Sequence, residues 1–172
     1  MARAATPAIA ALLAAGAPHE VLQYRHDPRN EAFGDEAAQA LASDAGVDAE
    51  QVFKTLVIAL SGGARSGPGR DLRLGVAVLP VPAKLSLKAA AAALGVPKAT
   101  MAERDAAERS SGYVIGGISP FGQRRPLPTV VDESALRWDR VLCSAGKRGW
   151  DVAVHPRDLI TLTNAVTADI RA

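Results

Sequence analysis

The apolar run at residues 52–60 restricts the fold of this chain more than any other segment. Its β-branched and aliphatic residues are typical of a buried strand. A Gly- and Ser-rich connection at residues 61–70 separates it from a second apolar run at residues 72–79. Because the connection is too short and too internal to link two domains, the two runs predict a β-hairpin.

Helices and strands alternate irregularly along the rest of the chain. Thr6 before Pro7, and Ser86 before an Ala-rich segment, are typical helix N-caps. Helices are predicted at residues 6–15, 35–42, 86–94, 103–109 and 156–163, with short helical turns at 48–51 and near Ser134. Strands are predicted at residues 20–24, 129–131, 140–144 and 151–154. Without a regular βαβ rhythm, these elements favour an α+β fold with a mixed sheet over a doubly wound one.

The composition of the chain bounds its domain number and its partners. With 172 residues, of which 48% are hydrophobic, it can form one substantial core and is predicted to be a single domain over residues 1–172. Residues 1–50 hold three Lys/Arg against eight Asp/Glu, whereas residues 51–172 hold seventeen against ten. The later part could therefore face a polyanion, although a solvated mixed surface explains the same split.

Three features bear on the compartment in which the chain works. A single cysteine, Cys143, excludes an internal disulfide framework and fits a reducing cytoplasm. No apolar run approaches membrane-spanning length. Arg3 and the Ala- and Leu-rich stretch after it have the pattern of a secretory signal, but Thr6 and Pro7 favour a helix of the fold. We therefore expect a cytoplasmic protein with no membrane partner.

The stretch at residues 112–122 contains a glycine pair, Gly116 and Gly117, between an apolar run and a Ser-Pro-Phe-Gly turn. Residues without side chains can adopt a positive φ and leave backbone N–H groups open to close approach. This is the chemistry of a site that holds a ligand by its main chain. A strand, a bulge and a turn with no ligand explain the same residues.

Lys54 stands at the start of the strongest predicted strand. Strand alternation places it on the same side as Leu56 and Ile58, and places Phe53, Thr55 and Val57 on the other. An ammonium among apolar neighbours must snorkel to solvent, find an anion or lose its charge. Near the floor of a pocket it could hold a phosphate or a carbonyl oxygen, and at a strand end snorkelling is an equally good explanation.

The segment at residues 144–151 combines small residues with two cations, Lys147 and Arg148. Ser144 opens it and Asp151 closes it. The small residues allow the backbone to form a concavity that accepts an anion, and the carboxylate of Asp151 could hold an amine. An ordinary cationic β-turn is the alternative.

The usual motifs of nucleophilic and metal catalysis are missing from the sequence. It has no Gly-x-Ser-x-Gly elbow, no Walker loop, no His-Glu-x-x-His and no paired cysteines. His19, His26 and His155 lie in separate predicted turns, and Cys143 lies in a predicted strand, where a buried inert thiol is the expected state. The sequence therefore predicts neither a protein nucleophile nor a metal or other cofactor.

Several motifs taken together resemble one known family, the YbaK (ProX) family of bacterial Cys-tRNA(Pro) deacylases. The resemblance covers nearly the whole chain in the family's order, and only the combination is specific. The motifs are Thr6-Pro7-Ala8-Ile9, Tyr24-Arg25-His26-Asp27-Pro28, Phe33-Gly34-Asp35-Glu36-Ala37-Ala38, Phe53-Lys54-Thr55-Leu56, residues 111–122 and Gly146-Lys147-Arg148-Gly149.

The resemblance implies an α+β fold formed by a single compact domain, with a mixed, partly barrel-like β-sheet surrounded by helices. This fold is related to the editing domain inserted in some prolyl-tRNA synthetases. It also implies a trans-editing hydrolase, because a synthetase pocket for proline discriminates against a similar-sized amino acid by only about 1–3 kcal/mol. The implied partners are the acceptor end of aminoacyl-tRNA(Pro) and, further, prolyl-tRNA synthetase itself.

The family's chemistry implies roles for particular residues. The substrate's own cysteine thiol attacks its ester and leaves as a cyclic thiolactone, while the protein contributes confinement and hydrogen bonds. The implied catalytic residues are Lys54, Gly116, Gly117 and Asp151. Those implied to bind the substrate are Tyr24, Phe33, Thr55, Ile118 and Ser144. Those implied to face tRNA phosphates are Arg124, Arg125, Lys147 and Arg148.

Two residues depart from the family's usual pattern. Ala145 stands where many relatives have glycine, and Trp150 stands where a smaller aliphatic residue is common, so the rim of the pocket is expected to differ. Other functions compatible with these residues are a deacylase that uses water to remove alanine or another small residue, a non-catalytic tRNA- or synthetase-binding module, and a small-molecule binding protein.

Overall fold

A computed structural model describes residues 5–62 and 73–172 of the chain. The predicted connection at residues 61–70 lies mostly outside the described residues, as does Leu72. The helices are α1 Pro7–Ala14, α2 Phe33–Ala45, α3 Leu87–Ala93, α4 Arg104–Ser111 and α5 Pro156–Thr163, with 3₁₀ turns at Ala49–Gln51 and Glu133–Arg137. The strands are β1 His19–Gln23, β2 Phe53–Ser61, β3 Arg73–Pro80, β4 Lys98–Met101, β5 Thr129–Asp132, β6 Val141–Lys147, β7 Trp150–Val154 and β8 Val166–Ala168.

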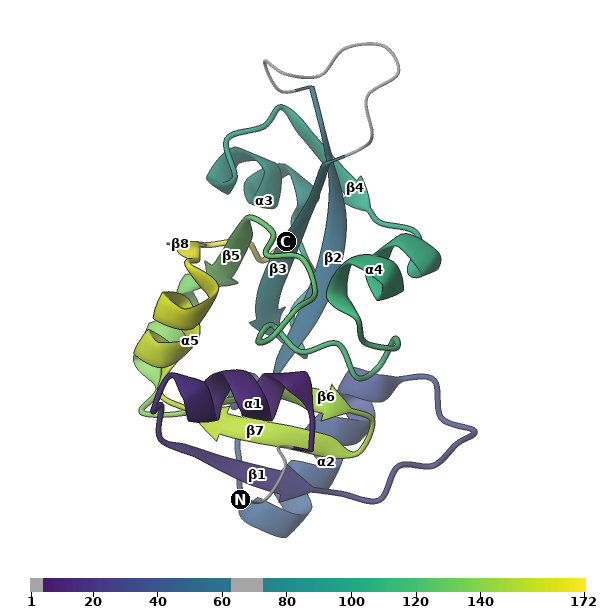
Figure 1. The fold of residues 1–172 in the computed structure, drawn as a ribbon, viewed down its shortest axis with the longest axis vertical. Helices are drawn as coiled ribbons and strands as arrows, with labels where there is room; N and C mark the ends of the chain where they lie inside the picture. The colour runs from purple at the N-terminus through teal and green to yellow at the C-terminus, as the bar shows by residue number, and fades with distance from the viewer. Residues whose placement is uncertain (1–4, 63–72) are drawn as a thin grey trace.

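The strands form two sheets (Figure 1). The five-stranded sheet has the order β4-β2-β3-β5-β8, with antiparallel pairs around β2 and parallel pairs on both sides of β5. The three-stranded sheet has the order β1-β7-β6 and is antiparallel throughout. A parallel bridge between Val52 and Leu142 joins the two sheets just before β2 begins. The α+β class with mixed strand directions is confirmed, as is the predicted pairing of β2 with β3.

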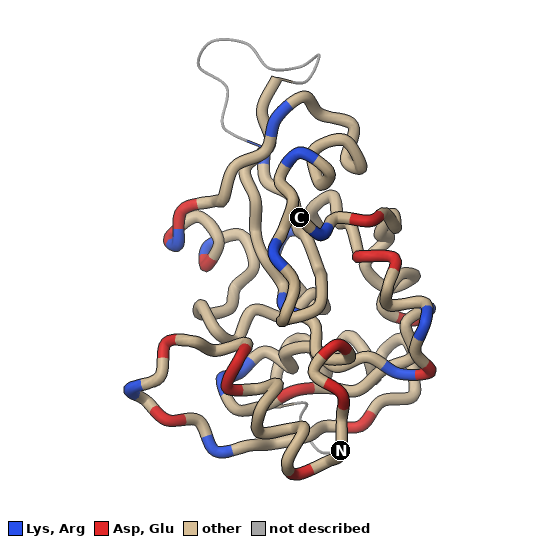
Figure 2. Tube along the Cα trace, turned by 180° about the vertical axis from the view of Figure 1, so that it is seen from behind, with Lys and Arg blue, Asp and Glu red and all other residues tan. Residues whose placement is uncertain are grey.

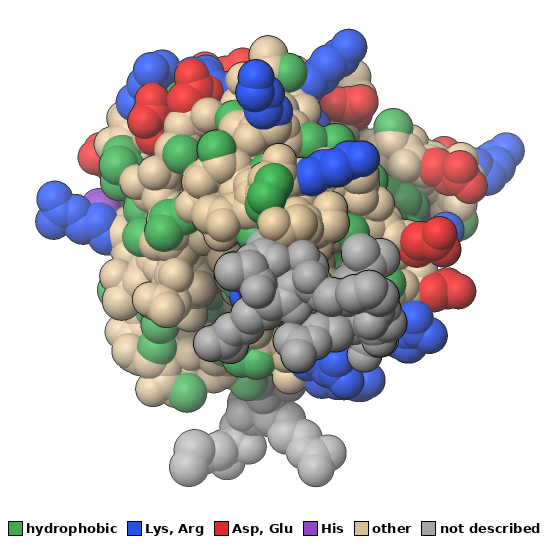
Figure 3. Space-filling model, turned by 90° about the horizontal axis from the view of Figure 1, so that it is seen from above, with side chains coloured by type: hydrophobic (Ala, Val, Ile, Leu, Met, Phe, Trp, Pro, Cys, Tyr) green, Lys and Arg blue, Asp and Glu red, His purple; other side chains and the backbone are tan. Residues whose placement is uncertain are grey.

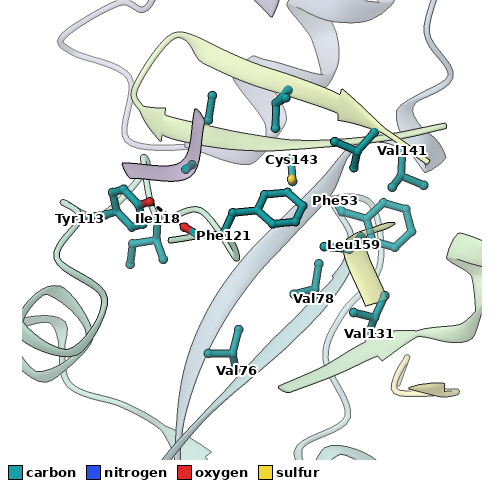
Figure 4. Packing of buried hydrophobic residues seen from close by; sticks show 14 of the residues in the cluster. Phe53, Val76, Val78, Tyr113, Ile118, Phe121, Val131, Val141, Cys143 and Leu159 are labelled. Atoms are coloured by element: carbon teal, nitrogen blue, oxygen red, sulfur yellow. Dashed lines mark hydrogen bonds between the residues drawn. The ribbon is translucent and has the colours of Figure 1, made fainter. Parts of the chain in front are cut away.

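Alternation along β6 and β7 divides the small sheet into two buried faces. Val141, Cys143 and Val152 pack on the side of α1, whereas Leu142 and Ala153 pack against α2. Figure 4 shows Cys143 and Val141 in the first of these cores, close to Phe53 from β2. Because side chains alternate, the polar residues Ser144 and Asp151 fall on the side of α2. This is the side on which the pocket described below opens.

The predicted alternation of β2 is confirmed by its packing. Phe53 and Val57 belong to the core under α1, whereas Ile58 and Leu60 belong to a second core that α3 covers with Ala90 and other small residues. Leu56 packs against this second core. Lys54 therefore leaves β2 on the side of α3, beyond the last apolar neighbour of that face.

Several boundaries and two short strands differ from the predictions. The strands β4 and β8 have four and three residues, too few for a period-two pattern to be recognised, and neither was predicted. The apolar run after Gly112 forms turns rather than a strand, with Tyr113 buried and its hydroxyl donating to the Phe121 carbonyl oxygen (2.6 Å). The helix α2 begins at Phe33, two residues before the predicted start.

The N-terminal cap of α1 connects this helix to the small sheet. The Thr6 hydroxyl accepts the Ile9 N–H at 3.1 Å, as its cap position predicts, and donates to the Ala145 carbonyl oxygen at 2.6 Å. The first helix is therefore part of the folded core. Within the part of the chain that the structure describes, no helix has the length and apolar character needed to cross a membrane.

Candidate functional site

A pocket of about 210 Å³ opens where the start of β2, the start of α2, the glycine pair and the β6–β7 hairpin meet. Eight of the nine residues predicted to be catalytic or to bind substrate line it: Tyr24, Phe33, Lys54, Thr55, Gly116, Ile118, Ser144 and Asp151. The other lining residues are small or apolar, and they are Gly34, Ala37, Val52, Phe53, Leu56, Val81 and Ile115. The pocket therefore has an apolar body with a few polar groups, as ligand sites commonly do.

Lys54 reaches its position because β2 begins next to the loop that follows β3. Its Nζ donates to the carbonyl oxygens of Ala83 (2.6 Å) and Val81 (3.3 Å). Burial lowers the pKa of this ammonium, and the nearby carboxylate of Asp35 opposes that shift. An ammonium has three N–H donors, so two are engaged by the main chain and one remains for a ligand.

Asp151 is the most deeply buried ionisable group of the pocket, with 4% of its surface exposed. It pairs with Ser144 across the β6–β7 ladder, and burial raises its pKa to about 7. Among the described residues no hydrogen bond or ion pair reaches its carboxylate. Burial and the charge of Asp151 together raise the pKa of Tyr24 to about 12. A buried carboxylate without a protein partner is suited to a cationic or hydrogen-bond-donating ligand.

Two hydroxyl groups complete the polar lining. The Oγ1 atom of Thr55 is buried and has no hydrogen-bond partner among the described residues. The Oγ of Ser144 accepts the Gly146 N–H at 3.1 Å and keeps its own hydrogen free to donate. The Ser144 hydroxyl can therefore bond to a polar group of a bound molecule.

The glycine pair meets Phe33 at the wall of the pocket. Gly116 has a φ of +84°, and a Cβ added there would lie 2.5 Å from Cγ of Phe33, so the ring lies directly against the glycine backbone. Gly117 was also predicted to hold the ligand through its main chain. It does not line the pocket, and its N–H donates to the Val114 carbonyl oxygen at 2.9 Å within a turn. Of the glycine pair, Gly116 alone lines the pocket.

Arg148 lies against the same wall instead of facing solvent. Its Nε donates to the Ile115 carbonyl oxygen at 2.9 Å, and its guanidinium carbon lies 4.6 Å from the centroid of the Phe33 ring. His26 approaches Phe33 as well, with 5.8 Å between ring centroids, and bonds to Glu36 of α2 at 2.6 Å. We call Phe33, Gly116 and Arg148 the aromatic clamp. It holds together the start of α2, the glycine loop and the β6–β7 turn, which are far apart in the sequence.

The other three predicted phosphate ligands are exposed and do not line the pocket. The backbone N–H groups of Arg124 and Arg125 donate to carbonyl oxygens at the end of α4, which fixes their loop beside that helix. Lys147 lies at the β6–β7 turn with its Nζ 4.8 Å from the Trp150 ring centroid. Ala145 and Trp150, which were expected to alter the rim, do not line the pocket, and Ala145 is buried on the side of α1.

Backbone carbonyls are the functional groups that sequence reasoning missed. The carbonyl oxygens of Val81 and Ala83 fix Lys54, and that of Ile115 fixes Arg148. Every residue has such an oxygen, so no side-chain pattern distinguishes these three. Their roles follow only from the tertiary structure.

The fold and the pocket define a class of ligand-binding α+β protein, and comparison with known proteins identifies the family. Residues 35–162 match the model of the aminoacyl-tRNA editing domain. EbsC of Enterococcus faecalis, named as a candidate Cys-tRNA(Pro)/Cys-tRNA(Cys) deacylase, is 35% identical over 134 residues, which are 78% of this chain and 76% of EbsC. The chain belongs to the aminoacyl-tRNA editing domain family, and its class of activity is aminoacyl-tRNA deacylation.

Solved structures show the same fold. A candidate trans-editing enzyme for prolyl-tRNA synthetase superposes with a TM-score of 0.72 at 24% identity, covering 90% of this chain and 87% of that one. A hypothetical protein superposes with a TM-score of 0.75, also at 24% identity, covering 94% and 96%. These similarities establish the architecture independently of the sequence motifs.

Proposed function

We propose that this chain removes cysteine from mischarged tRNA(Pro) in trans. One observation carries the proposal: the same small pocket is lined by a lysine with one free N–H and by a buried carboxylate with no hydrogen-bond or ion-pair partner among the described residues. The names of the Enterococcus relative and of the candidate trans-editing enzyme support the choice of substrate. The same substrate assigns the protein to the cytoplasm and makes prolyl-tRNA synthetase a further partner.

Each end of a cysteinyl ester has a partner in this arrangement. The carboxylate of Asp151 accepts the aminoacyl ammonium, and the free N–H of Lys54 donates to the ester or to the terminal ribose. Tyr24, Phe33 and Ile118 surround the short side chain, and Thr55 lines the same pocket. A volume of about 210 Å³ suits a small side chain and excludes a large one.

The reaction proposed for this pocket uses the substrate's thiol as the nucleophile. The sulfur forms a bond to the ester carbonyl carbon, the ester C–O bond breaks, and its electron pair leaves with the ribose oxygen. The thiol proton ends on that oxygen, so the products are a cyclic thiolactone and free tRNA. Lys54 stabilises the negative charge that develops, and confinement brings thiol and carbonyl together.

Cys143 has no part in this chemistry. Its thiol is fully buried on the side of α1, and burial raises its pKa well above the usual value. Outside the pocket, Arg124, Arg125 and Lys147 are exposed cations, and we assign them to phosphates of the acceptor end. Arg148 is committed to the aromatic clamp.

One observation favours a second candidate, a deacylase for alanine that uses water. With a pKa of about 7, Asp151 could serve as a general base near neutral pH, which the thiol mechanism does not need. An alanyl ester has no internal nucleophile, so a base for water would then be essential. The two candidates differ in what they require of the substrate.

A single-turnover time course distinguishes the two candidates. The substrates are tRNA(Pro) carrying cysteine, S-methylcysteine, alanine or serine, with enzyme in excess. The thiol mechanism predicts loss of cysteine alone and recovery of the thiolactone in a trap, because methylation removes the nucleophile while preserving the size class. Hydrolysis of alanine and S-methylcysteine at similar rates would replace it with the water mechanism. No loss from any substrate would refute both.

A further inference from the structure

We propose that a run of exposed cations leading away from the pocket binds the backbone of the tRNA acceptor stem. This inference rests on the proposed function, which places the terminal aminoacyl ester in the pocket. We call Arg73, Lys84, Lys88 and Lys98 the cationic strip; all four side chains are exposed. Residues 73–102 contain these four cations and no Asp or Glu.

The strip begins at the rim of the pocket. The carbonyl oxygen of Ala83 receives a hydrogen bond from Lys54, and Lys84 is the next residue. Lys88 follows in the first turn of α3, which covers the face of β2 on which Lys54 lies. The cations of the strip therefore continue the positive charge of Lys54 outwards from the site.

The far end of the strip lies at the opposite end of β2. Lys98 pairs with Ser61, the last residue of β2, and Arg73 pairs with Leu60 on the other side. From Lys54 to Ser61 the strand rises roughly 23 Å at about 3.3 Å per residue. Paired residues of neighbouring strands share a face of the sheet, so Arg73 lies on the face of Leu60 and α3, and Lys98 lies on the opposite face at the same end of the sheet. Cations spread over this length can contact more than one phosphate of a helical stem, whereas a single nucleotide would contact one.

The distribution of acidic residues indicates on which side of the pocket the acceptor stem lies. In the view from behind, Lys and Arg follow one another up the part of the molecule near the C-terminus (Figure 2). Asp169, in the C-terminal segment that bonds to Ser86 between Lys84 and Lys88, is paired with Arg171 at 3.4 Å. On the other side of the pocket, α2 begins with Asp35 and Glu36, and residues 1–50 carry eight acidic residues against three basic ones. A polyanion leaving the pocket is attracted to the first side and repelled by the second.

Seen from above, charged side chains of both signs surround the described part of this end of the molecule (Figure 3). Lys and Arg side chains project there around the rim of the visible face (Figure 3). The strip carries no sequence information of its own, because phosphate contacts position a nucleic acid without reading its bases. Its expected role is to add affinity for the stem and to orient the 3′ end toward Lys54.

The test compares two double charge reversals in the full chain. K88E/K98E alters the strip and leaves Lys84 intact, because its neighbour Ala83 holds Lys54. R137E/R157E is the matched control, since both arginines are exposed and lie in the 3₁₀ turn at Glu133–Arg137 and in α5. Each variant is measured with Cys-tRNA(Pro) and with a cysteinyl terminal trinucleotide, which contains the ester but no stem. Thermal melting verifies that both variants fold.

The proposal predicts that K88E/K98E lowers the ratio of kcat/KM for the full tRNA to that for the trinucleotide at least tenfold. It also predicts that the slope of log affinity against log salt becomes shallower by about 2, since roughly 0.9 is lost per phosphate contact. The control variant should keep the wild-type ratio and slope. If the ratio of kcat/KM falls equally in both variants, or falls in neither, the proposed role of the cationic strip is overturned. If wild type fails to hydrolyse Cys-tRNA(Pro) while the strip still governs tRNA affinity, the proposed function fails and the proposed role of the strip remains.

Discussion

The two walls of the pocket are built in different ways. Lys54 is held by main-chain carbonyls of the loop after β3, and that loop is held by the C-terminal segment: the Ser86 N–H donates to Ile170 and the Ala172 N–H donates to Lys84. Those two bonds measure 2.7 and 2.8 Å. The aromatic clamp instead depends on side chains, with Arg148 stacked on Phe33 and joined to the adjacent loop by one hydrogen bond.

Because of this difference, we expect the two walls to have different functions in the reaction. Main-chain hydrogen bonds fix the position of the Lys54 charge closely, which is what electrostatic stabilisation of a reacting ester requires. The clamp controls the shape of the pocket, because Phe33 and Gly116 touch without room for another atom. Substitutions on the first wall should therefore reduce the rate of reaction, and substitutions on the second should mainly affect substrate binding.

Lys54→Ala should have the largest effect. It removes the donor proposed for the ester, and loss of such a group costs roughly 10²–10³ in the single-turnover rate. Stability should change little, since the ammonium is half-buried and its carbonyl partners become accessible to water. The measurement is deacylation of Cys-tRNA(Pro) at enzyme excess. Arg137→Ala removes one exposed positive charge elsewhere and serves as control; a loss of less than threefold for Lys54→Ala would remove the lysine from the mechanism.

Gly116→Ala should follow, with a tenfold or greater rise in KM. A positive φ costs about 1–2 kcal/mol for a residue with a Cβ, and here the Cβ also collides with the Phe33 ring. Gly95→Ala is a matched control, because Gly95 has a φ of +74° and nothing within 4 Å of an added Cβ. Both variants should lose stability in urea unfolding, and only Gly116→Ala should lose substrate affinity. Equal KM values would show that the Phe33 contact has no role in binding.

Asp151→Asn should have a smaller effect that depends on pH. The folded pKa of about 7 lies above the usual aspartate pKa of 3.8, so the folded state binds more protons than the unfolded state between these values. Wild-type stability should therefore fall as pH rises from about 4 to about 7 and then level off. The asparagine variant lacks this loss, so its stability relative to wild type should increase over the same range. Urea unfolding at pH 4 and pH 8 measures the difference.

The same variant tests the proposed contact with the substrate ammonium. Only the ionised carboxylate forms a charged pair, so wild-type affinity should rise through pH 7, and the variant should bind about tenfold more weakly at pH 8. At pH 6 the two proteins should differ less. A difference independent of pH would point to a steric effect of the substitution.

The position of Lys54 on the first wall was largely predictable from the sequence, whereas the aromatic clamp was not. Alternation along β2 correctly placed Lys54 with Leu56 and Ile58, because a strand fixes the direction of each side chain. Adjacent basic residues at the β6–β7 turn suggested that Lys147 and Arg148 share a role, yet one is exposed and the other lies on Phe33. Loops have no such periodicity, so the meeting of three of them depends on the whole fold.

The candidate site as a set was predicted from the family resemblance more than from local patterns. The residues alone left Lys54, the glycine pair and the segment at 144–151 each with a structural alternative. Nothing in local sequence indicated that Asp151 would lose contact with water, since its burial comes from packing of β1 and α2 on either side of β7. Tertiary contacts supply the chemistry that distinguishes this carboxylate from an exposed one.

Arg148→Met should have the smallest effect and the most specific one. Methionine keeps the apolar contact with Phe33 but removes the cation and the hydrogen bond to Ile115, so the clamp should loosen without a cavity. We expect KM for Cys-tRNA(Pro) to rise roughly threefold to tenfold, since a contact of this kind is worth about 0.5–1.5 kcal/mol. The value of kcat should remain near wild type, because Arg148 acts on the reaction through Phe33 and Gly116. Arg148→Lys keeps the charge and loses the planar donor. Its KM should therefore lie between those of wild type and Arg148→Met. If the cysteinyl trinucleotide, which lacks most phosphates, shows the same rise in KM, the effect comes from the shape of the pocket; a rise confined to full-length tRNA would instead return Arg148 to phosphate binding.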